Sequence, residues 1–184
     1  MKLRIRFWHL LFCCLLINLF IYSPKVWAQN QSPLLVKSNS SNGAFISQNY
    51  IKNGLNHSPP LQWINIPVQT QSLAIICADP DAPCGLWIHW LAWNIPPSLK
   101  SIEEACPKNS TLPNGMIQGR NSFGQIGYDG PSPPPGKLHH YYFTVYALNT
   151  KLNLRPGANY QEVKQAMAKH ILCQGYFMGT YNSH

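Results

Sequence analysis

The segment Ser72-Leu-Ala-Ile-Ile-Cys-Ala78 sets the class of the fold, because every residue after the serine is apolar. A short, continuous apolar run of this kind fits a strand that is buried on both faces. It leads directly into Asp79-Pro-Asp81-Ala-Pro83, where two prolines predict a rigid turn whose aspartates cannot easily swing away. From turn statistics alone, capping aspartates explain this turn as well as a binding site does.

Outside this segment, short apolar runs alternate with turn residues. Sixteen prolines and twelve glycines separate the runs, which is typical of an all-β chain with loops at the strand ends. Apolar side chains at helical spacing predict a helix over 160–172, and a second short helical turn is expected near 101–105. Strands are predicted at 34–37, 61–66, 73–78, 88–95, 141–148 and 176–181. We therefore expect a mainly β fold: a β-sandwich of antiparallel-rich sheets with one or two peripheral helices near the C-terminus.

The first 28 residues have the pattern of a secretory signal peptide. Lys2, Arg4 and Arg6 precede a nearly unbroken apolar run over 7–21, and Val26-Trp-Ala28 fits the small-x-small rule for cleavage. An uncleaved membrane anchor is the alternative, but the run is short for a bilayer span, which needs about 20 residues. We expect cleavage after Ala28, one domain over 29–184 with no stable membrane span, and a periplasmic or secreted location.

Cleavage would also change the charge of the chain. The full sequence has 14 basic and 6 acidic residues, a net charge of +8. Residues 1–28 hold four of the basic residues and none of the acids, which leaves 10 against 6, or +4. The remaining lysines are scattered singly, as on an ordinary solvated surface, so nucleic acid is not expected as a partner.

Four cysteines remain after cleavage: Cys77, Cys84, Cys106 and Cys173. An even number in an oxidising compartment predicts disulfides, and the spacing leaves all three pairings open. We favour a Cys84–Cys106 disulfide, because both residues stand in loop-like sequence. No CxxC or Cys/His zinc spacing occurs, so neither a metal nor another cofactor is expected.

Two further segments carry side chains suited to ligand binding. In Trp87-Ile-His-Trp-Leu-Ala-Trp93, strand alternation predicts that residues 87, 89, 91 and 93 share one face. A histidine among tryptophans is, however, more often a core residue than a functional one. In 127–143, a Gly/Pro-rich loop leads into a strand whose alternation puts His139 and Tyr141 on one face and His140 on the other. A surface loop followed by an aromatic core strand would explain this segment equally well.

Four motifs in order resemble the phosphatidylethanolamine-binding family, and most closely its bacterial, Raf-kinase-inhibitor-like branch. They are Asp-Pro-Asp-Ala-Pro (79–83), Trp-x-His-Trp (87–90), Gly-x-Asn-Ser-Phe-Gly (119–124) and Gly-Pro-x-Pro-Pro-x-Gly-x-x-His-x-Tyr (130–141). The resemblance extends from about residue 34 to residue 181. It implies a β-sandwich with a small pocket at one end that binds anions such as phosphate, a phospholipid headgroup or carboxylate.

Carried over by motif, the resemblance assigns these residues to the pocket: Asp79, Trp87, His89, Pro133, Pro134, His139 and Tyr141. We also expect a cis bond between Ala82 and Pro83, as turn prolines sometimes have. Two positions depart from the family pattern. His140 stands where many bacterial members carry an arginine, and Ser132 stands where some carry a cysteine.

The residue types favour binding over catalysis. Two imidazoles and Tyr141 can donate hydrogen bonds to an anion, while Asp79 fixes the tautomer of His89 or His139. No Gly-x-Ser-x-Gly nucleophile elbow occurs, and Asp79 and Asp81 are neighbours in a turn rather than carboxylates across a cleft. We expect an exported, non-catalytic module for a small anion. The alternatives are a protease or kinase inhibitor that holds a protein partner at the pocket mouth, and a metal-dependent hydrolase using His89, His139 and Asp79.

Overall fold

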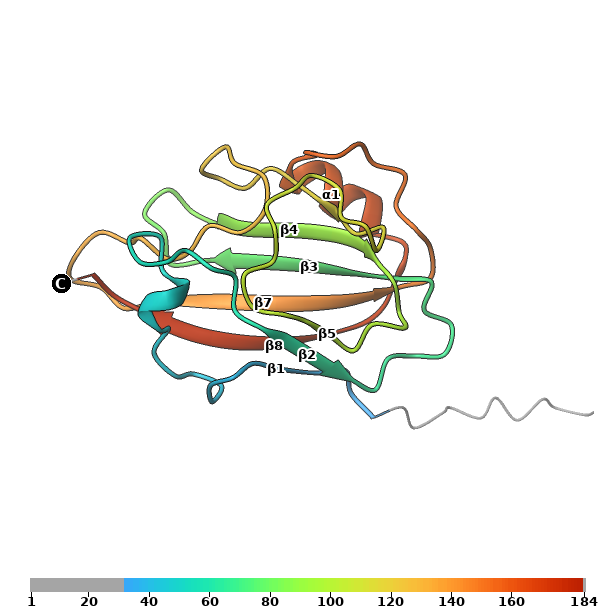
Figure 1. Ribbon diagram of the computed structural model, residues 1–184, viewed down its shortest axis with the longest axis horizontal. Helices are drawn as coiled ribbons and strands as arrows, with labels where there is room; N and C mark the ends of the chain where they lie inside the picture. Colours follow the sequence, from blue (N-terminus) through green and yellow to red (C-terminus); the bar gives the residue numbers. More distant parts are fainter. Residues whose placement is uncertain (1–31, 184) are drawn as a thin grey trace, which may run out of the picture. The chain divides into compact units, whose positions relative to one another are not determined.

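The computed structural model describes residues 32–183, and the predicted signal peptide lies outside these described residues. The larger of two sheets has five antiparallel strands in the order β6-β4-β3-β7-β8 (Figure 1). These strands are β3 (Ser72–Asp79), β4 (Trp87–Ile95), β6 (Ile117–Gln118), β7 (His139–Leu148) and β8 (Ile171–Tyr181). The central strands β3 and β4 are buried along nearly their whole length, as the continuous apolar run in 72–78 predicts.

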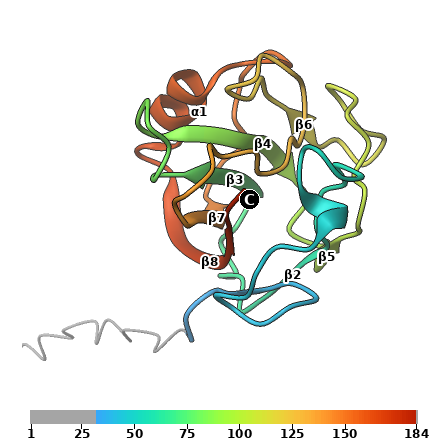
Figure 2. The ribbon, with the colours of Figure 1, turned by 90° about the vertical axis from the view of Figure 1, so that its left-hand side faces the viewer.

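The second sheet has three antiparallel strands in the order β1-β2-β5, which are β1 (Leu35–Lys37), β2 (Leu61–Ile64) and β5 (Ser101–Ile102). In Figure 2, β2 and β5 lie apart from the layer formed by β4, β3 and β7. The main hydrophobic core joins the two sheets and contains Trp63 from β2, Trp90 from β4 and Phe143 from β7, each at most 1% exposed. Burial of aromatic side chains from both sheets in one core confirms the predicted β-sandwich.

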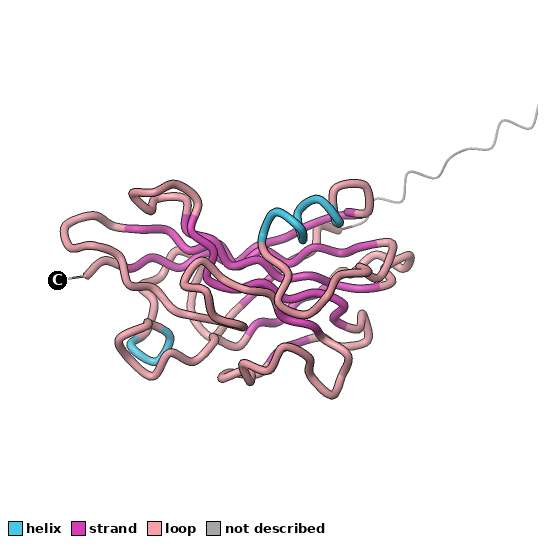
Figure 3. The backbone as a smooth tube through the Cα atoms, turned by 90° about the horizontal axis from the view of Figure 1, so that it is seen from above, coloured by secondary structure: helices cyan, strands magenta, loops and turns pink. Residues whose placement is uncertain are grey.

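A second core lies on the opposite face of the five-stranded sheet, under the helix α1 (Tyr160–Met167). Val163 and Met167 of the helix pack with Ala74 of β3 and Trp93 of β4. Figure 3 shows this helix lying over the strands. It begins with a capping box, in which the Asn159 side chain accepts from the first-turn amides and the Glu162 side chain accepts from the Asn159 amide.

Two local predictions were wrong where pairing with distant strands overrides the local pattern. The predicted helix over 160–172 ends at Met167, because the chain from Ile171 onward pairs with β7 as strand β8. The helical turn expected near 101–105 is instead β5, which pairs with β2. The sequence pattern also missed a single 3-10 turn, η1 (Gln48–Tyr50). Within the part of the chain that the structure describes, no helix has the length and hydrophobicity needed to span a membrane.

Candidate functional site

A small cavity opens at one end of the larger sheet, where β3 ends and where β4 and β7 begin. Its volume is about 170 Å³, which is small beside the roughly 300–1,000 Å³ typical of pockets for drug-sized ligands. The residues that line it are Asp79, Ala82, Pro83, Cys84, Trp87, His89, Phe123, Ser132, Pro133, Pro134, His139 and Tyr141. The structure thus brings together every residue assigned to the pocket by motif, although their binding of a ligand stays a prediction.

A β-bulge in β4 turns His89 toward this cavity. Ala78 of β3 pairs with Ile88 and Cys77 pairs with Trp90, so His89 has no partner on β3. The extra residue resets the alternation: Trp90 packs in the core between the sheets, whereas Leu91 and Trp93 pack in the core under α1. The expectation that residues 87, 89, 91 and 93 share one face was therefore wrong. Bulges of this kind commonly redirect a side chain next to a site.

Because of the bulge, His89 faces the same side of the sheet as Tyr141. Their rings meet edge to face, with centroids 5.1 Å apart. Phe123 also meets the imidazole edge to face, at a centroid distance of 5.6 Å, and its ring meets Trp87 edge to face. These aromatic rings form the apolar wall of the cavity and fix the plane of the His89 ring.

Asp79 holds His139, which stands at the first position of β7. The Oδ2 atom of Asp79 lies 2.7 Å from Nδ1 of His139, and both side chains are almost completely buried. The Oδ1 atom accepts the backbone N–H of Asp81 at 2.8 Å, which closes the turn after β3. Both carboxylate oxygens therefore have protein partners, and Asp79 orients His139 rather than His89. Alternation along β7 is as predicted, with His139 and Tyr141 buried and His140 only half-buried.

His89 is held instead by the backbone of Asp129, a residue that the sequence patterns did not single out. Nδ1 of His89 lies 2.7 Å from the Asp129 carbonyl oxygen, and the Asp129 amide donates to the His89 carbonyl at 3.0 Å. Since a carbonyl can only accept, the proton of a neutral His89 ring sits on Nδ1. Burial lowers the pKa of His89, partly offset by the bond to the Asp129 carbonyl, so the ring is neutral at neutral pH.

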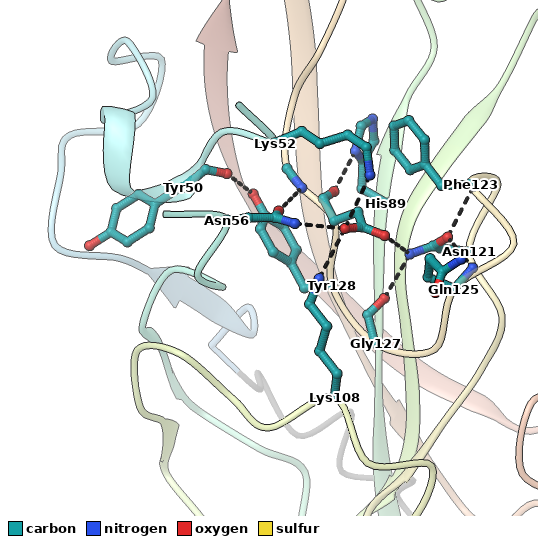
Figure 4. A network of polar contacts seen from close by, with 12 residues as sticks. Tyr50, Lys52, Asn56, His89, Lys108, Asn121, Phe123, Gln125, Gly127 and Tyr128 are labelled. Atoms are coloured by element: carbon teal, nitrogen blue, oxygen red, sulfur yellow. Dashed lines mark hydrogen bonds and ion pairs between the residues drawn. The ribbon is translucent and has the colours of Figure 1, made fainter. Parts of the chain in front are cut away.

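The buried Asp129 carboxylate is at the centre of a polar network. Figure 4 shows its partners Asn56, Lys108 and Asn121 around His89. The carboxylate accepts from the side-chain amides of Asn56 and Asn121 and from Nζ of Lys108 at 2.7–2.9 Å, and Lys52 lies 3.4 Å away. Burial raises the pKa of Asp129, but these hydrogen bonds outweigh it and lower the pKa to about 2. The partners come from three separate segments of the chain, so no local sequence pattern indicates this network.

Among the fully buried side-chain atoms of the cavity lining that the structure describes, the hydroxyl of Tyr141 is the one without a hydrogen bond. Its side chain is 1% exposed, and its hydroxyl has no hydrogen-bond partner in residues 32–183. Burial, and after it the nearby Asp79 carboxylate, raise the pKa of Tyr141 far above its ordinary value, so the O–H keeps its proton. A buried hydroxyl without a partner costs free energy, which a ligand in the cavity can recover by accepting its hydrogen bond.

The two departures from the family pattern have different places. His140 lies outside the cavity lining and contacts Asp81, whose Oδ2 is 2.7 Å from Nδ1 and 3.0 Å from the amide of His140. The hydrogen bond to His140 lowers the pKa of Asp81, and Lys137 adds to this effect from 3.3 Å. Ser132 is on the cavity wall. Because a serine stands at position 132, the thiol among the described residues that line the cavity is that of Cys84.

Three further expectations are not supported. Cys84 lines the cavity, Cys106 lines a separate hollow with Tyr128, and neither is in a disulfide, so the favoured pairing is absent. None of the described peptide bonds is cis, and the turn at Pro83 is closed by the Gly85 amide, which donates to the Ala82 carbonyl at 2.9 Å. In residues 32–183, no three His, Cys, Asp or Glu side chains gather closely enough to hold a metal ion. Residues 32–183 therefore offer no donor set of three such side chains for the metal-dependent hydrolase.

Comparison with known proteins identifies relatives of this chain. Residues 36–182 match the family described as "Phosphatidylethanolamine-binding protein". The chain is 46% identical over 136 residues to a UPF0098 protein of Methanothermobacter thermautotrophicus. The aligned region covers 74% of this chain and 89% of that protein. A UPF0098 protein of Pyrococcus abyssi is 49% identical over 149 residues, which covers 79% of this chain and 83% of that protein.

Two crystal structures have a similar fold. The Escherichia coli protein YbcL, described as a member of the mammalian PEBP family, superposes with a TM-score of 0.78 at 30% identity and covers 83% of this chain and 100% of its own. The Chlamydia trachomatis protein CT736, described as a PEBP homolog, superposes with a TM-score of 0.75 at 34% identity, covering 83% and 99%.

Proposed function

Because the chain belongs to the phosphatidylethanolamine-binding protein family, we propose that it is an exported, non-catalytic module that binds a small anion in the cavity formed by β3, β4 and β7. The ligand classes are phosphate, a phospholipid headgroup and carboxylate. The observation that carries this proposal is the buried hydroxyl of Tyr141, which lines the cavity and has no partner in the described part of the protein.

The rigidity of the cavity supports binding without large rearrangement. His139 is fixed by Asp79, His89 is fixed by the backbone of Asp129, and Pro133 and Pro134 also line the cavity. Little conformational entropy is then lost when a ligand enters. Each charge-assisted hydrogen bond contributes about 1.5–3 kcal/mol before the costs of association, so two or three such bonds support a weak to moderate affinity.

The groups in the cavity support binding over covalent catalysis. Ser132 and Cys84 are on its wall, but each histidine directs Nδ1 toward a structural partner, and neither nucleophile has a hydrogen bond to an imidazole among the described residues. A nucleophile of this kind needs a base within hydrogen-bonding distance for activation.

A second candidate function, binding of a protein partner at the mouth of the cavity, is favoured by two exposed leucines. Leu86 and Leu138 are 47% and 45% exposed and immediately precede the cavity residues Trp87 and His139. Exposed apolar side chains beside a pocket are common features of interaction sites. Recovery of a specific protein from an envelope extract by the wild type, and its loss on Leu138→Ser, would favour this function over anion binding alone.

Isothermal titration with inorganic phosphate and phosphoethanolamine tests the anion site directly. Wild-type protein should release heat with both, His139→Ala should release little, and the control His170→Ala should match the wild type. His170 is a suitable control because its ring contacts Asn149 and does not line the cavity. Equal heats from the wild type and His139→Ala would refute the assignment of the site. Export is tested separately, by expressing the full chain and finding whether the mature N-terminus is Gln29.

A further inference from the structure

The contacts of the two cavity histidines indicate which ring nitrogen donates a hydrogen bond and which can accept one. Both rings use Nδ1 for an acceptor in the protein, the Asp129 carbonyl for His89 and the Asp79 carboxylate for His139. Nε2 is the one other polar atom of each ring; the hydrogen bonds formed by the two rings to described residues join Nδ1, and the backbone of Gly130 also lies near the His89 ring. When such a ring is neutral, its Nε2 offers a lone pair and not a proton. The initial expectation that both imidazoles donate to an anion therefore holds only for protonated rings.

The charge of the cavity also differs from that of an ordinary anion site. No lysine or arginine is among the described residues that line it, and its one acidic residue, Asp79, is already paired with His139. Three lysines in this region are already paired: Lys52 and Lys108 contact Asp129, and Lys137 contacts Asp81. Lys52 also lies over the ring of Phe123, on the cavity wall, at 4.1 Å from its centroid. A doubly charged anion would therefore enter without a fixed countercharge, which is costly in a desolvated site.

We propose, building on the anion-binding function above, that the cavity selects a phosphate group in its singly charged, protonated form, whose P–OH donates a hydrogen bond to Nε2 of His89. The hydroxyl of Tyr141 then donates to an unprotonated oxygen of the same group. Free phosphate and phosphate monoesters can carry such a P–OH. Phosphodiesters, including the headgroups of most membrane phospholipids, cannot, and are the disfavoured class.

His89 is the acceptor because it is the ring held by a neutral carbonyl. The titratable groups that face it are His139 and Asp79 across the cavity, Tyr141 beside it, and the carboxylate of Asp129 behind it. Lys52 and Lys108 neutralise Asp129, so that carboxylate does not promote protonation of His89 as strongly as an unpaired one would. Burial lowers the pKa of His89, which is consistent with a ring that accepts at neutral pH.

Two ligands of nearly equal size and equal charge isolate the contribution of the P–OH group to affinity. At about pH 5.5, methylphosphonate is a monoanion with one P–OH, and dimethylphosphinate is a monoanion in which a methyl group replaces that hydroxyl. Titration of wild-type protein should give methylphosphonate an affinity about ten- to hundredfold higher, the effect of one charge-assisted hydrogen bond. Equal affinities would overturn the proposal and leave the anion site intact. Binding of neither ligand, nor of phosphate, would refute the proposed function itself.

Further ligands distinguish the source of the phosphate group. Phosphoethanolamine, a monoester, should bind more tightly than glycerophosphoethanolamine, a diester with the same amine, and the reverse order would contradict the proposal. Among ligands with a P–OH, inorganic phosphate and vesicles containing phosphatidic acid distinguish a free ion from a lipid monoester. Capture by the vesicles with no binding of inorganic phosphate assigns the lipid, and the opposite result assigns the free ion.

The protonation of His89 can be observed directly. Nitrogen-15 spectra of labelled protein at neutral pH should show a proton on Nδ1 and none on Nε2 of His89. His89→Ala assigns the signals, and His170→Ala serves as the control. A proton on Nε2 of His89 in the ligand-free protein would overturn the proposal, because that nitrogen could not accept from a P–OH.

Discussion

Asp79 and His139 are 60 residues apart in the chain, and the Oδ2 of one lies 2.7 Å from Nδ1 of the other. The pair joins the end of β3 to the beginning of β7, although these strands already pair along their length. The structural role of Asp79 is to tie the turn at the cavity to β7, since its second oxygen holds the amide of Asp81. The stability of this end of the sandwich and the anion binding proposed for it thus depend on the same carboxylate.

Replacement of Asp79 by alanine should destabilise the protein by about 3 kcal/mol, because it leaves His139 and the Asp81 amide buried without an acceptor. The matched control is Asp81→Ala, whose more exposed carboxylate should cost about 1 kcal/mol. Urea unfolding of both variants measures the difference. Equal losses would show that Asp79 is not the tie between the turn and β7.

Replacement of Tyr141 by phenylalanine should weaken phosphate binding about tenfold, while the free energy of unfolding stays the same or rises. The hydroxyl lies near the Asp79 carboxylate but makes no hydrogen bond of good geometry with the described residues, so its removal breaks no strong internal hydrogen bond. Tyr142→Phe is the control, because Tyr142 lies on the opposite face of β7 and contacts Tyr176. Isothermal titration measures the affinity for phosphate, and urea unfolding measures the stability. An unchanged affinity in Tyr141→Phe would count against the proposed anion site.

Acid should destabilise the protein through Asp129. Its pKa is about 2 in the folded protein against an ordinary 3.8, so the unfolded chain binds the proton first as pH falls. The contribution, roughly 2 kcal/mol, is complete above about pH 4 and is lost between about pH 4 and pH 2. Urea unfolding at several pH values should show this loss in the wild type and a flatter profile in Asp129→Asn. Identical profiles would contradict the role of the network.

A second pH dependence should come from His89, in a higher pH range. Burial lowers its pKa from 6.5, so the unfolded chain gains a proton below that pH while the folded ring stays neutral. Stability should therefore fall as the pH decreases from about 6.5 toward the lower folded pKa. His89→Gln should reduce this slope, and His170→Gln should not. A wild-type slope that both variants preserve would show that His89 is not buried in its neutral form.

Phosphate should bind more tightly at pH 6 than at pH 8. At the lower pH a larger share of the ligand carries a P–OH, and any protonated imidazole in the cavity can donate to it. Sulfate keeps two charges across this range and is the control, with little binding expected at either pH. A flat profile for phosphate would indicate that neither the proton on the ligand nor the histidines contribute to binding.

Much of the fold could be predicted from local patterns. The apolar run in 72–78 is a strand buried on both faces, and the alternation along β7 correctly separates His139 and Tyr141 from His140. Such patterns work because side-chain periodicity reports which faces of a strand are buried. The motif resemblance then named the residues that meet at the cavity, since a family pattern includes contacts that no local pattern contains.

Other features depend on partners that lie far apart in the chain. The direction of the His89 side chain follows from the β-bulge in the pairing of β4 with β3. The partners of the Asp129 carboxylate come from three separate segments of the chain. Residues from Ile171 onward form a strand rather than a helix because β7 offers them a complete ladder. Periodicity carries information about neighbours along the chain, whereas bulges, buried ion networks and strand register are fixed by the free energy of contacts between segments. The amino-acid order therefore established the sandwich and the residues of its cavity, and the packed protein established which nitrogen, oxygen and hydroxyl those residues present to a ligand.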